Sequence, residues 1–456
     1  MVSVRIQKTP SRMIRLLRLL VGMLLCNLVL SGCDMLGKKS KPPLEGRRIP
    51  VVTEATSKEL NLPVMPVTVS LEPSVQVQDW HQPGFDSFHR TPHIKLSGSG
   101  KTLQRTGSFP FGTGLSPEGR ILSSPIVVGD ILYGIDAQTR LIALSLKTKG
   151  VLWSKDLSPD YKMGSYTLGG GVSHEKGQLF ATTAYGDLVA LDAKTGCKQW
   201  QKALGSPCRA APVIKKDRVY TLTVDNQLQV FDAKTGELVW SHAGISENLG
   251  LLGTSVPAVD EDMVVVAYGS GEVFGLRPET GSVVWSEHVS SGKRGDFASS
   301  LSDIQAMPVI SQQAVYISNQ DGKLAALHLQ SGRRLWERDL ACLQTPAISG
   351  DFLFVLTQNN TLLCLNKLHG ELHWSTCLPV PKGCEGKNTW SGPILANGRL
   401  YVVGIQGCLM ALSPQTGAIE QTLALPTGGF VPPVATSQGI FVLTDDGVVT
   451  SFQPAP

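Results

Sequence analysis

The chain has 456 residues, of which 47 are glycine and 17% are charged, a composition that suits many short strands joined by tight turns. The formal net charge of +4 does not indicate a nucleic-acid-binding protein. The first 32 residues hold five of the 41 basic residues and no acidic one, which leaves 36 basic against 37 acidic residues in the rest of the chain. A chain of this length usually folds as several domains, but an internal repeat predicts a single ring here.

Residues 1–32 have the pattern of a lipoprotein signal peptide. A basic stretch precedes an apolar run from Leu16 to Leu30, and Leu30-Ser31-Gly32 then leads to Cys33. Small residues before a cleavage point indicate a secretory signal, and the cysteine after them resembles the bacterial lipobox. We therefore expect Cys33 to carry acyl chains such as palmitate and to become the mature N-terminus. An ordinary signal peptide, or an uncleaved anchor with a chance cysteine, is the alternative.

Acyl chains on Cys33 would hold the protein at a membrane and leave the rest in the periplasm. The expected location is the outer membrane, although Asp34 resembles the retention signal of enteric bacteria and keeps the inner membrane open. Residues 33–73 are expected to form a flexible tether, because they are rich in proline and poor in large apolar side chains. A flexible chain of this length has a mean span on the order of 35 Å.

One phrase recurs from residue 74 to residue 456. In Phe231–Trp240 it reads FDAKTGELVW, which is the end of one strand, a turn and the start of the next strand. Gly236 can take a positive φ in that turn without steric cost. The phrase ends in tryptophan six times, at Trp153, Trp200, Trp240, Trp285, Trp336 and Trp374, whereas the copy at Leu412–Gln421 has lost it. A period of about 40–50 residues with four short strands indicates a β-propeller blade.

The repeat predicts an all-β fold, an eight-bladed β-propeller of PQQ-like repeats. The expected blades are 122–156, 168–203, 210–243, 255–288, 305–339, 344–377, 391–424, and 431–453 together with 74–81. The last blade lacks its tryptophan strand, and Val75–Trp80 alternates apolar and polar residues before ending in Trp80. We therefore expect Val75–Trp80 to close the ring, which removes an open sheet edge. The blade tryptophans, Trp80 included, are expected to pack between neighbouring blades.

Seven cysteines remain in the mature chain besides Cys33. Cys377 and Cys384 bracket a short loop, so they are the favoured disulfide in an oxidising compartment, with Cys197–Cys208 as the second choice. The sequence has no Cys-x-x-Cys zinc pattern and no Ser/His/Asp arrangement that would justify a catalytic assignment. No metal, cofactor or catalytic residue is predicted.

The Asp-x-x-Thr-Gly-x-x-x-Trp phrases resemble the repeats of pyrroloquinoline-quinone dehydrogenases. With the lipobox, eight units and this length, the chain more closely resembles the BamB family of lipoproteins from the outer-membrane β-barrel assembly (BAM) machinery, in its alphaproteobacterial form. The resemblance covers residues 74–456 and includes WHQPG at Trp80–Gly84, GLLG at Gly250–Gly253 and WSGP at Trp390–Pro393. It implies a scaffold without catalysis, a monomer within a hetero-complex that binds the POTRA domains of BamA and other BAM components.

Two connections between blades would form the partner surface that the resemblance implies. The family pattern Leu-x-Leu-Arg reads LGLL at Leu249–Leu252, and the pattern Ser-Asp-x-Asp reads SDIQ at Ser302–Gln305. The apolar residues of the family pattern are thus matched better than the charged ones. Charged residues at an interface affect association rate and specificity more than affinity. The alternative is that both connections are surface turns. The residues expected to bind the partner are Leu249, Leu251, Leu252, Asp303 and Gln305.

Two other functions compete with the scaffold. A quinone-dependent dehydrogenase would be expected to show a vicinal Cys-Cys pair, acidic calcium ligands and a catalytic aspartate, and the chain has no Cys-Cys pair. A binding or sensor propeller for another envelope protein would keep the fold and lose the surface around Leu249 and Asp303. Unfolded outer-membrane proteins could also pair with a blade edge, but no motif in the chain indicates it.

Overall fold

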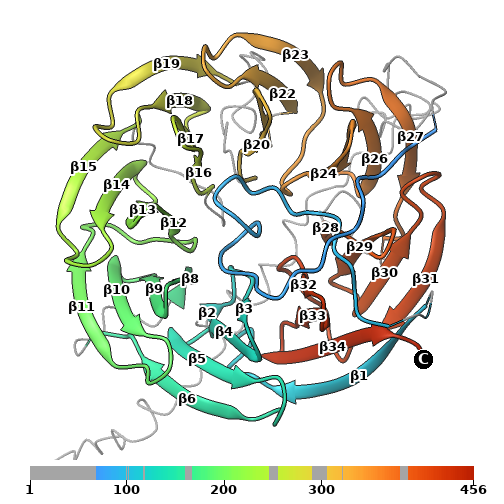
Figure 1. Cartoon of the computed structure of the whole chain (residues 1–456), viewed down its shortest axis with the longest axis horizontal. Helices are drawn as coiled ribbons and strands as arrows, with labels where there is room; N and C mark the ends of the chain where they lie inside the picture. The colour runs from blue at the N-terminus through green and yellow to red at the C-terminus, as the bar shows by residue number, and fades with distance from the viewer. Residues whose placement is uncertain are drawn as a thin grey trace, which may run out of the picture. The chain divides into compact units, whose positions relative to one another are not determined.

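The computed structural model describes residues 68–98, 100, 102–116, 119–159, 167–245, 255–289, 306–320, 322–380 and 389–456. They form a ring of eight four-stranded antiparallel sheets, an eight-bladed β-propeller, as the repeat predicts (Figure 1). Each sheet runs from an inner strand at the channel to an outer strand at the rim. Within these ranges, no helix is long and apolar enough to cross a membrane. Residues 1–67, with Cys33 and Asp34, lie outside the described part.

The strands of the first four blades follow the chain in order. Blade 1 consists of β3 (Ile126–Val128), β4 (Ile131–Ile135), β5 (Arg140–Ser145) and β6 (Val151–Asp156). Blade 2 consists of β8 (Gly170–Glu175), β9 (Gln178–Thr183), β10 (Asp187–Asp192) and β11 (Lys198–Ala203). Blade 3 consists of β12 (Val213–Lys215), β13 (Arg218–Leu222), β14 (Gln227–Asp232) and β15 (Leu238–Ala243). Blade 4 consists of β16 (Ala258–Val259), β17 (Val264–Ala267), β18 (Glu272–Leu276) and β19 (Val283–His288).

The remaining blades repeat this order until the last. Blade 5 consists of β20 (Val309–Ser311), β21 (Ala314–Ser318), β22 (Lys323–His328) and β23 (Arg334–Asp339). Blade 6 consists of β24 (Ala347–Ser349), β25 (Phe352–Leu356), β26 (Thr361–Asn366) and β27 (Leu372–Cys377). Blade 7 consists of β28 (Trp390–Ala396), β29 (Arg399–Gly404), β30 (Cys408–Leu412) and β31 (Ile419–Ala424). Blade 8 joins β32 (Val434–Thr436), β33 (Gly439–Leu443) and β34 (Val448–Pro454) to β1 (Leu103–Pro110), and a short parallel pair links β2 (Gly119–Arg120) to β7 (Thr167–Leu168).

The recurring phrase, which reads Asp-x-x-Thr-Gly in blades 2 and 3, forms the tight turn into the outer strands of blades 1–7. In blade 3, Asp232 Oδ1 accepts hydrogen bonds from the backbone N–H groups of Lys234 and Thr235, at 3.0 and 2.8 Å. Gly236 follows with φ +69°, and its N–H donates to the Asp232 carbonyl at 2.8 Å. The strand register then shifts by one residue, a bulge that recurs in blades 1–7 and increases the local twist. The turn chemistry is thus local and readable from the sequence.

The outer-strand tryptophan of one blade packs on the turn glycine of the next. A Cβ at Gly236 would lie 2.8 Å from the Trp200 ring, whose Nε1–H donates to the Ala233 carbonyl at 3.1 Å. We call this arrangement the Trp–Gly seam. It links blades 1 to 7 through six pairs: Trp153–Gly196, Trp200–Gly236, Trp240–Gly281, Trp285–Gly332, Trp336–Gly370 and Trp374–Gly417.

The ring is closed by an N-terminal strand, as predicted, but Val75–Trp80 is not that strand. β1 closes it, pairing antiparallel with β34 from Leu103 opposite Pro454 to Pro110 opposite Val448 (Figure 1). Since β1 reads LQRTGSFP and contains no tryptophan, its sequence lacks the signal that Val75–Trp80 imitates. Trp80 belongs to an irregular segment across the channel, so its expected role as a blade tryptophan is also wrong.

Candidate functional site

Residues 68–98, called the plug segment here, cross the centre of the ring on one face (Figure 1). The segment has no regular strand, yet it hydrogen-bonds all eight blades at or beside their inner strands. The bonds to blades 1–4 are Trp80 N to Val127 O, His174 N to His81 O, Ile214 N to Gln82 Oε1 and Val259 N to Ser87 O, at 2.6–2.8 Å. The bonds to blades 5–8 are Ile310 N to Phe88 O, Glu72 N to Ser349 Oγ, Ile94 N to Leu395 O and Ser97 N to Ser437 O, at 2.7–3.0 Å.

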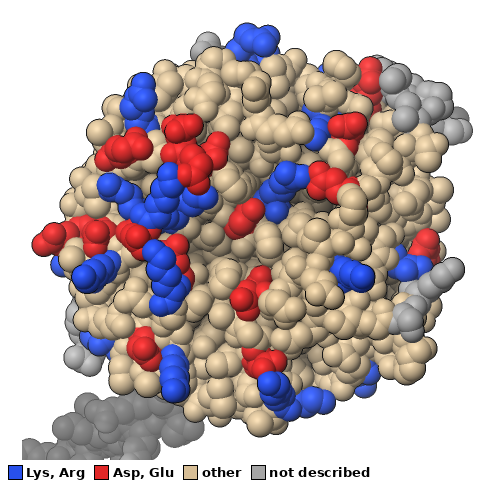
Figure 2. Space-filling model, in the orientation of Figure 1, with Lys and Arg blue, Asp and Glu red and all other residues tan. Residues whose placement is uncertain are grey.

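The plug segment closes its end of the channel. Seen from this side, the centre of the ring is filled, and acidic and basic side chains lie intermixed around it without a large patch of one sign (Figure 2). Trp80 is 3% exposed and meets Phe85 edge-on, with ring centroids 5.6 Å apart. Val69, which the sequence assigns to the tether, already packs in the core of blades 6 and 7. Contact with the ring therefore begins before the predicted boundary at residue 73.

Neutral histidines hold the plug segment to the ring. His89 is fully buried and its Nδ1–H donates to the Pro308 carbonyl at 2.8 Å, while Nε2 has no partner, and burial lowers the pKa of His89 to about 4. His93 accepts the Gly398 N–H at Nε2 and donates from Nδ1 to the Glu72 carbonyl, both at 2.8 Å. Desolvation, with a smaller contribution from His81, lowers the pKa of His174 to about 4.

One carboxyl group in the plug segment has a raised pKa, whereas the pKa values of His89 and His174 are lowered. Asp86 Oδ1 accepts the N–H groups of Phe88 and Arg90, at 3.0 and 3.1 Å, and forms the turn that presents Phe88 to blade 5. Desolvation outweighs those bonds and raises the pKa of Asp86 to about 6. At pH 7, His89 and His174 are therefore neutral, whereas Asp86 is still mostly ionised.

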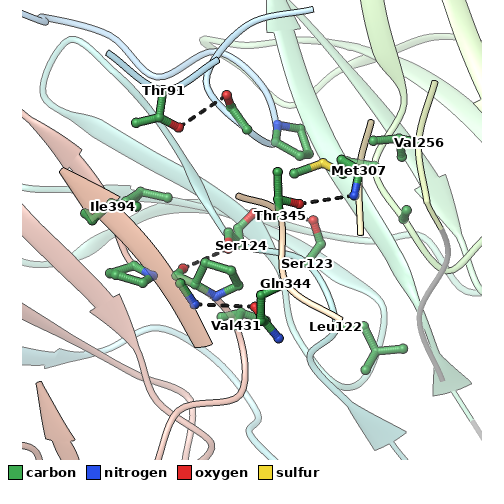
Figure 3. Close-up of a pocket in the computed structure, with 18 of the residues that line it drawn as sticks. Thr91, Leu122, Ser123, Ser124, Val256, Met307, Gln344, Thr345, Ile394 and Val431 are labelled. Atoms are coloured by element: carbon green, nitrogen blue, oxygen red, sulfur yellow. Dashed lines mark hydrogen bonds between the residues drawn. The ribbon is translucent and has the colours of Figure 1, made fainter. Parts of the chain in front are cut away.

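Behind the plug segment, the channel holds a cavity of about 180 Å³ (Figure 3). Its polar groups mostly tie neighbouring blades together: Ser124 Oγ donates to the Pro432 carbonyl at 2.8 Å, and Thr345 Oγ1 accepts the Met307 N–H at 3.1 Å. Gln344 Oε1 accepts the Gly392 N–H at 3.3 Å. The polar lining is thus used in holding the ring together.

The lining does not fit a quinone and calcium site. Among the described residues around the cavity, Arg209 is the only ionisable side chain, and neither a carboxylate nor a cysteine lines it. Calcium takes carboxylate and carbonyl oxygens, and a general base has to lie within hydrogen-bond reach of its proton. The described part of the chain also holds no cluster of three His, Cys, Asp or Glu side chains suited to a metal.

The predicted partner surface falls on two connections outside the described residues. Leu249, Leu251 and Leu252 lie between β15 and β16 in the chain, and Asp303 and Gln305 lie between β19 and β20. The plug segment sits at the turns between first and second strands, where Asp79 accepts the Gly129 N–H. Since strand direction alternates, the strand ends that bound these two connections lie on the opposite face. Ile245, the last described residue before the first connection, is 63% exposed.

The cysteines divide into buried and exposed thiols. Cys377 is exposed at the end of β27, and Cys384 lies outside the described residues, so that disulfide stays a prediction. The second choice is wrong: Cys197 is an exposed free thiol and Cys208 a buried one. Burial raises the pKa of Cys208, as expected for a thiol that serves core packing.

The ring of eight blades, with its Trp–Gly seams, defines the class of the protein as an eight-bladed β-propeller of PQQ-type repeats. The family model described as "Outer membrane protein assembly factor BamB" matches residues 137–376, more than half of the chain. The chain therefore belongs to the BamB family, as the repeat phrases indicate.

Relatives and a solved structure agree with this assignment. An uncharacterized protein of Rickettsia prowazekii is 29% identical over 266 residues, which cover 58% of this chain and 64% of that protein, slightly less than two thirds of its length. The outer membrane protein assembly factor BamB of Yersinia pestis is 24% identical over 333 residues, covering 72% of this chain and 83% of that protein. The crystal structure of BamB from Moraxella catarrhalis, at 21% identity, superposes with a TM-score of 0.66 over 77% of this chain and all of that one, which shows the shared fold.

Proposed function

We propose that this chain is a non-catalytic scaffold lipoprotein of the machinery that assembles outer-membrane β-barrel proteins. It binds the POTRA domains of BamA, within a complex with other BAM components, and assists insertion of outer-membrane proteins. The observation that carries the proposal is the match of the BamB family model over residues 137–376. The cavity lining supports the non-catalytic part, because it offers no carboxylate, histidine or cysteine for acid–base or nucleophilic chemistry.

The partner surface consists of the connections that carry Leu249, Leu251 and Leu252 in the first case and Asp303 and Gln305 in the second. Adjacent apolar side chains are typical of an interaction patch, and the exposed Ile245 extends that patch into the described part of the chain. Leu252 and Gln305 replace an arginine and an aspartate of the family pattern. The contact is therefore more apolar here, with less charge to direct association.

Cys33 carries the lipid, in the outer membrane facing the periplasm, and residues 34–67 form the tether. The described chain enters the ring on the plug face, where the Ser70 carbonyl lies beside Gly350 in a turn between first and second strands. The strand ends that bound the two partner connections lie on the other face of the ring from that entry.

Affinity capture of the lipidated protein from detergent-solubilised envelopes tests the proposal. We expect a BamA-type barrel with POTRA domains among the main partners. Leu249→Asp with Leu251→Asp should reduce that capture at least tenfold, about 1.4 kcal/mol, and leave thermal unfolding unchanged. Leu238→Asp is the matched control, because Leu238 is 57% exposed on an outer strand away from both connections. Capture of another envelope protein in place of BamA would replace the proposal with a binding module for that protein.

A further inference from the structure

The seam between blades 8 and 1 lacks the tryptophan that fills the Trp–Gly seams. In blade 8, Gly107 of β1 pairs with Ser451 of β34, and the register shift directly before it matches the bulge of the other blades. In blade 3 that place is occupied by Trp240, opposite Val230. Gly107 therefore stands where six other outer strands carry tryptophan.

The facing turn has changed in a complementary way. Lys149 occupies the place of Gly236, since its N–H donates to the Ser145 carbonyl at 2.8 Å as Gly236 does to Asp232, and it keeps φ +58°. At a Trp–Gly seam a Cβ in this position would strike an indole ring, as at Gly281, where it would lie 2.4 Å from Trp240. Here a Cβ added at Gly107 would have Lys149 Nζ as its nearest neighbour, at 3.0 Å. A side chain fits in the turn because the tryptophan is absent.

The surroundings of a seam tryptophan remain in place around a cavity of about 190 Å³. Phe441, the third residue of β33, lines the cavity. Tyr220 is the third residue of β13 in blade 3, and its ring centroid lies 6.1 Å from that of Trp240. Leu146 lines it at the place of Ala233, whose carbonyl accepts the indole N–H of Trp200. Phe441 is 4% exposed and forms an apolar floor, whereas the exposed Lys149 forms part of the rim. A cavity of about 150 Å³ is already large enough for a benzene ring.

We propose that this cavity, the seam socket, binds one aromatic side chain presented by an extended segment of an outer-membrane β-barrel protein. The identity of that partner rests on the proposed function; the aromatic chemistry rests on Phe109, Leu146 and Phe441, which line the cavity beside Lys149. Lys149 faces the ring as a cation. β1 is the edge strand of its sheet, so an extended segment can pair alongside it. Membrane β-strands carry aromatic residues in girdles at both interfaces, which supplies the side chain.

Two synthetic peptides test the socket on the full chain. One is a ten-residue strand of alternating apolar and polar residues with a single 5-fluorotryptophan, and its twin has alanine there and an aliphatic trifluoroacetyl label at its N-terminus. We expect a saturable ¹⁹F NMR shift for the first and at least tenfold weaker binding for the second. Absence of a shift with the tryptophan peptide, or equal binding of both peptides, would overturn the proposal.

Variants of the chain locate the binding. Gly107→Trp with Lys149→Gly rebuilds a Trp–Gly seam and fills the socket, so it should lower peptide affinity at least tenfold. Lys149→Gly alone leaves the cavity open and should lower it only a few-fold through loss of the cation. If the double variant fails to fold, Gly107→Phe fills the same space. Equal peptide binding by a folded, filled variant contradicts the socket.

The peptide experiment separates this inference from the scaffold proposal. The filled variant should still capture BamA, because the two partner connections belong to blades 3–5. Peptide binding by a wild-type chain that captures no BamA would overturn the scaffold proposal and support the socket. BamA capture without peptide binding would do the reverse.

Discussion

The six Trp–Gly seams and the two seams of blade 8 solve the same packing problem with different chemistry. In the former, an indole packs on a glycine of the next blade, and in five of the six it donates to a backbone carbonyl, as Trp336 does to Lys367 at 2.9 Å. Between blades 7 and 8, Gln421 takes the tryptophan position. Its Oε1 accepts the Leu103 N–H at 2.9 Å and its Nε2 donates to the Leu103 carbonyl at 2.7 Å.

The difference follows from how the chain closes the ring. Neighbouring blades within the repeat follow one another directly along the chain, so an apolar contact of large area is enough to hold them. β1 has to find β34 from the other end of the chain, and a slip of one residue would reverse its faces. A bidentate amide contact with one backbone unit fixes the register, which an apolar surface does not do.

The largest expected effect is the loss of a Trp–Gly seam. Trp336→Ala should lower the free energy of unfolding by about 3–5 kcal/mol, because it removes a buried indole and leaves a cavity between blades 5 and 6. Urea unfolding measures it. Trp153→Ala is the comparison, since Trp153 is half-buried and its Nε1 has no partner. A loss at Trp153 as large as that at Trp336 would mean that the indole hydrogen bond and its burial do not matter.

The turn glycine should be almost as sensitive. Gly236→Ala places a Cβ 2.8 Å from Trp200 in a backbone with φ +69°, so we expect a loss of at least about 2 kcal/mol in urea unfolding. Lys149→Ala, at the matching turn of the seam between blades 8 and 1, should change stability by less than about 0.5 kcal/mol. Equally small losses at the two turns would show that the Trp200 indole does not require glycine at Gly236.

The plug segment, which hydrogen-bonds all eight blades, should respond to acid. His89 has a pKa of about 4 in the folded chain and 6.5 unfolded, so its contribution to stability is complete above pH 6.5 and is lost as the pH falls towards 4. The loss is about 1.4 kcal/mol per pH unit. Asp86, with a folded pKa of about 6, acts in the opposite direction between about pH 4 and 6, whereas His174 acts in the same direction as His89.

A variant isolates the His89 contribution to this pH dependence. His89→Asn keeps a donor for the Pro308 carbonyl and removes the titrating ring. Between pH 6.5 and 4.5 its urea-unfolding free energy should fall by about 2 kcal/mol less than that of the wild type. Identical pH profiles would mean that His89 is not held neutral by burial.

The smallest expected effect is at the seam between blades 7 and 8. Gln421→Ala leaves the N–H and carbonyl of Leu103 without their side-chain partner, which should lower stability by about 1–2 kcal/mol in urea unfolding. The same change should increase proteolysis at β1, the strand that Gln421 positions. Gln104→Ala, an exposed position of the same strand, is the control. If proteolysis at β1 is unchanged, Gln421 does not fix that strand.

The blades and their seams were predictable because their signals are local. Asp232, Thr235 and Gly236 specify a turn within five residues, and Trp240 follows at a fixed spacing, so seven blades can be placed from the repeat. The fluorine-labelled peptides and the capture experiment address what the repeat leaves open. The residues expected to bind BamA came from the family resemblance and not from the repeat, and they lie outside the described residues.

The sequence by itself determined the number of blades, the tryptophans between them and the need for an N-terminal strand to close the ring. Only the tertiary structure decided which strand does so, because β1 has no tryptophan and its pairing with β34 joins the two ends of the propeller. It also decided the plug segment, whose hydrogen bonds to eight blades have no periodicity in sequence. The seam socket depends on the same closure, because the pairing of β1 with β34 is what brings Gly107 next to Lys149.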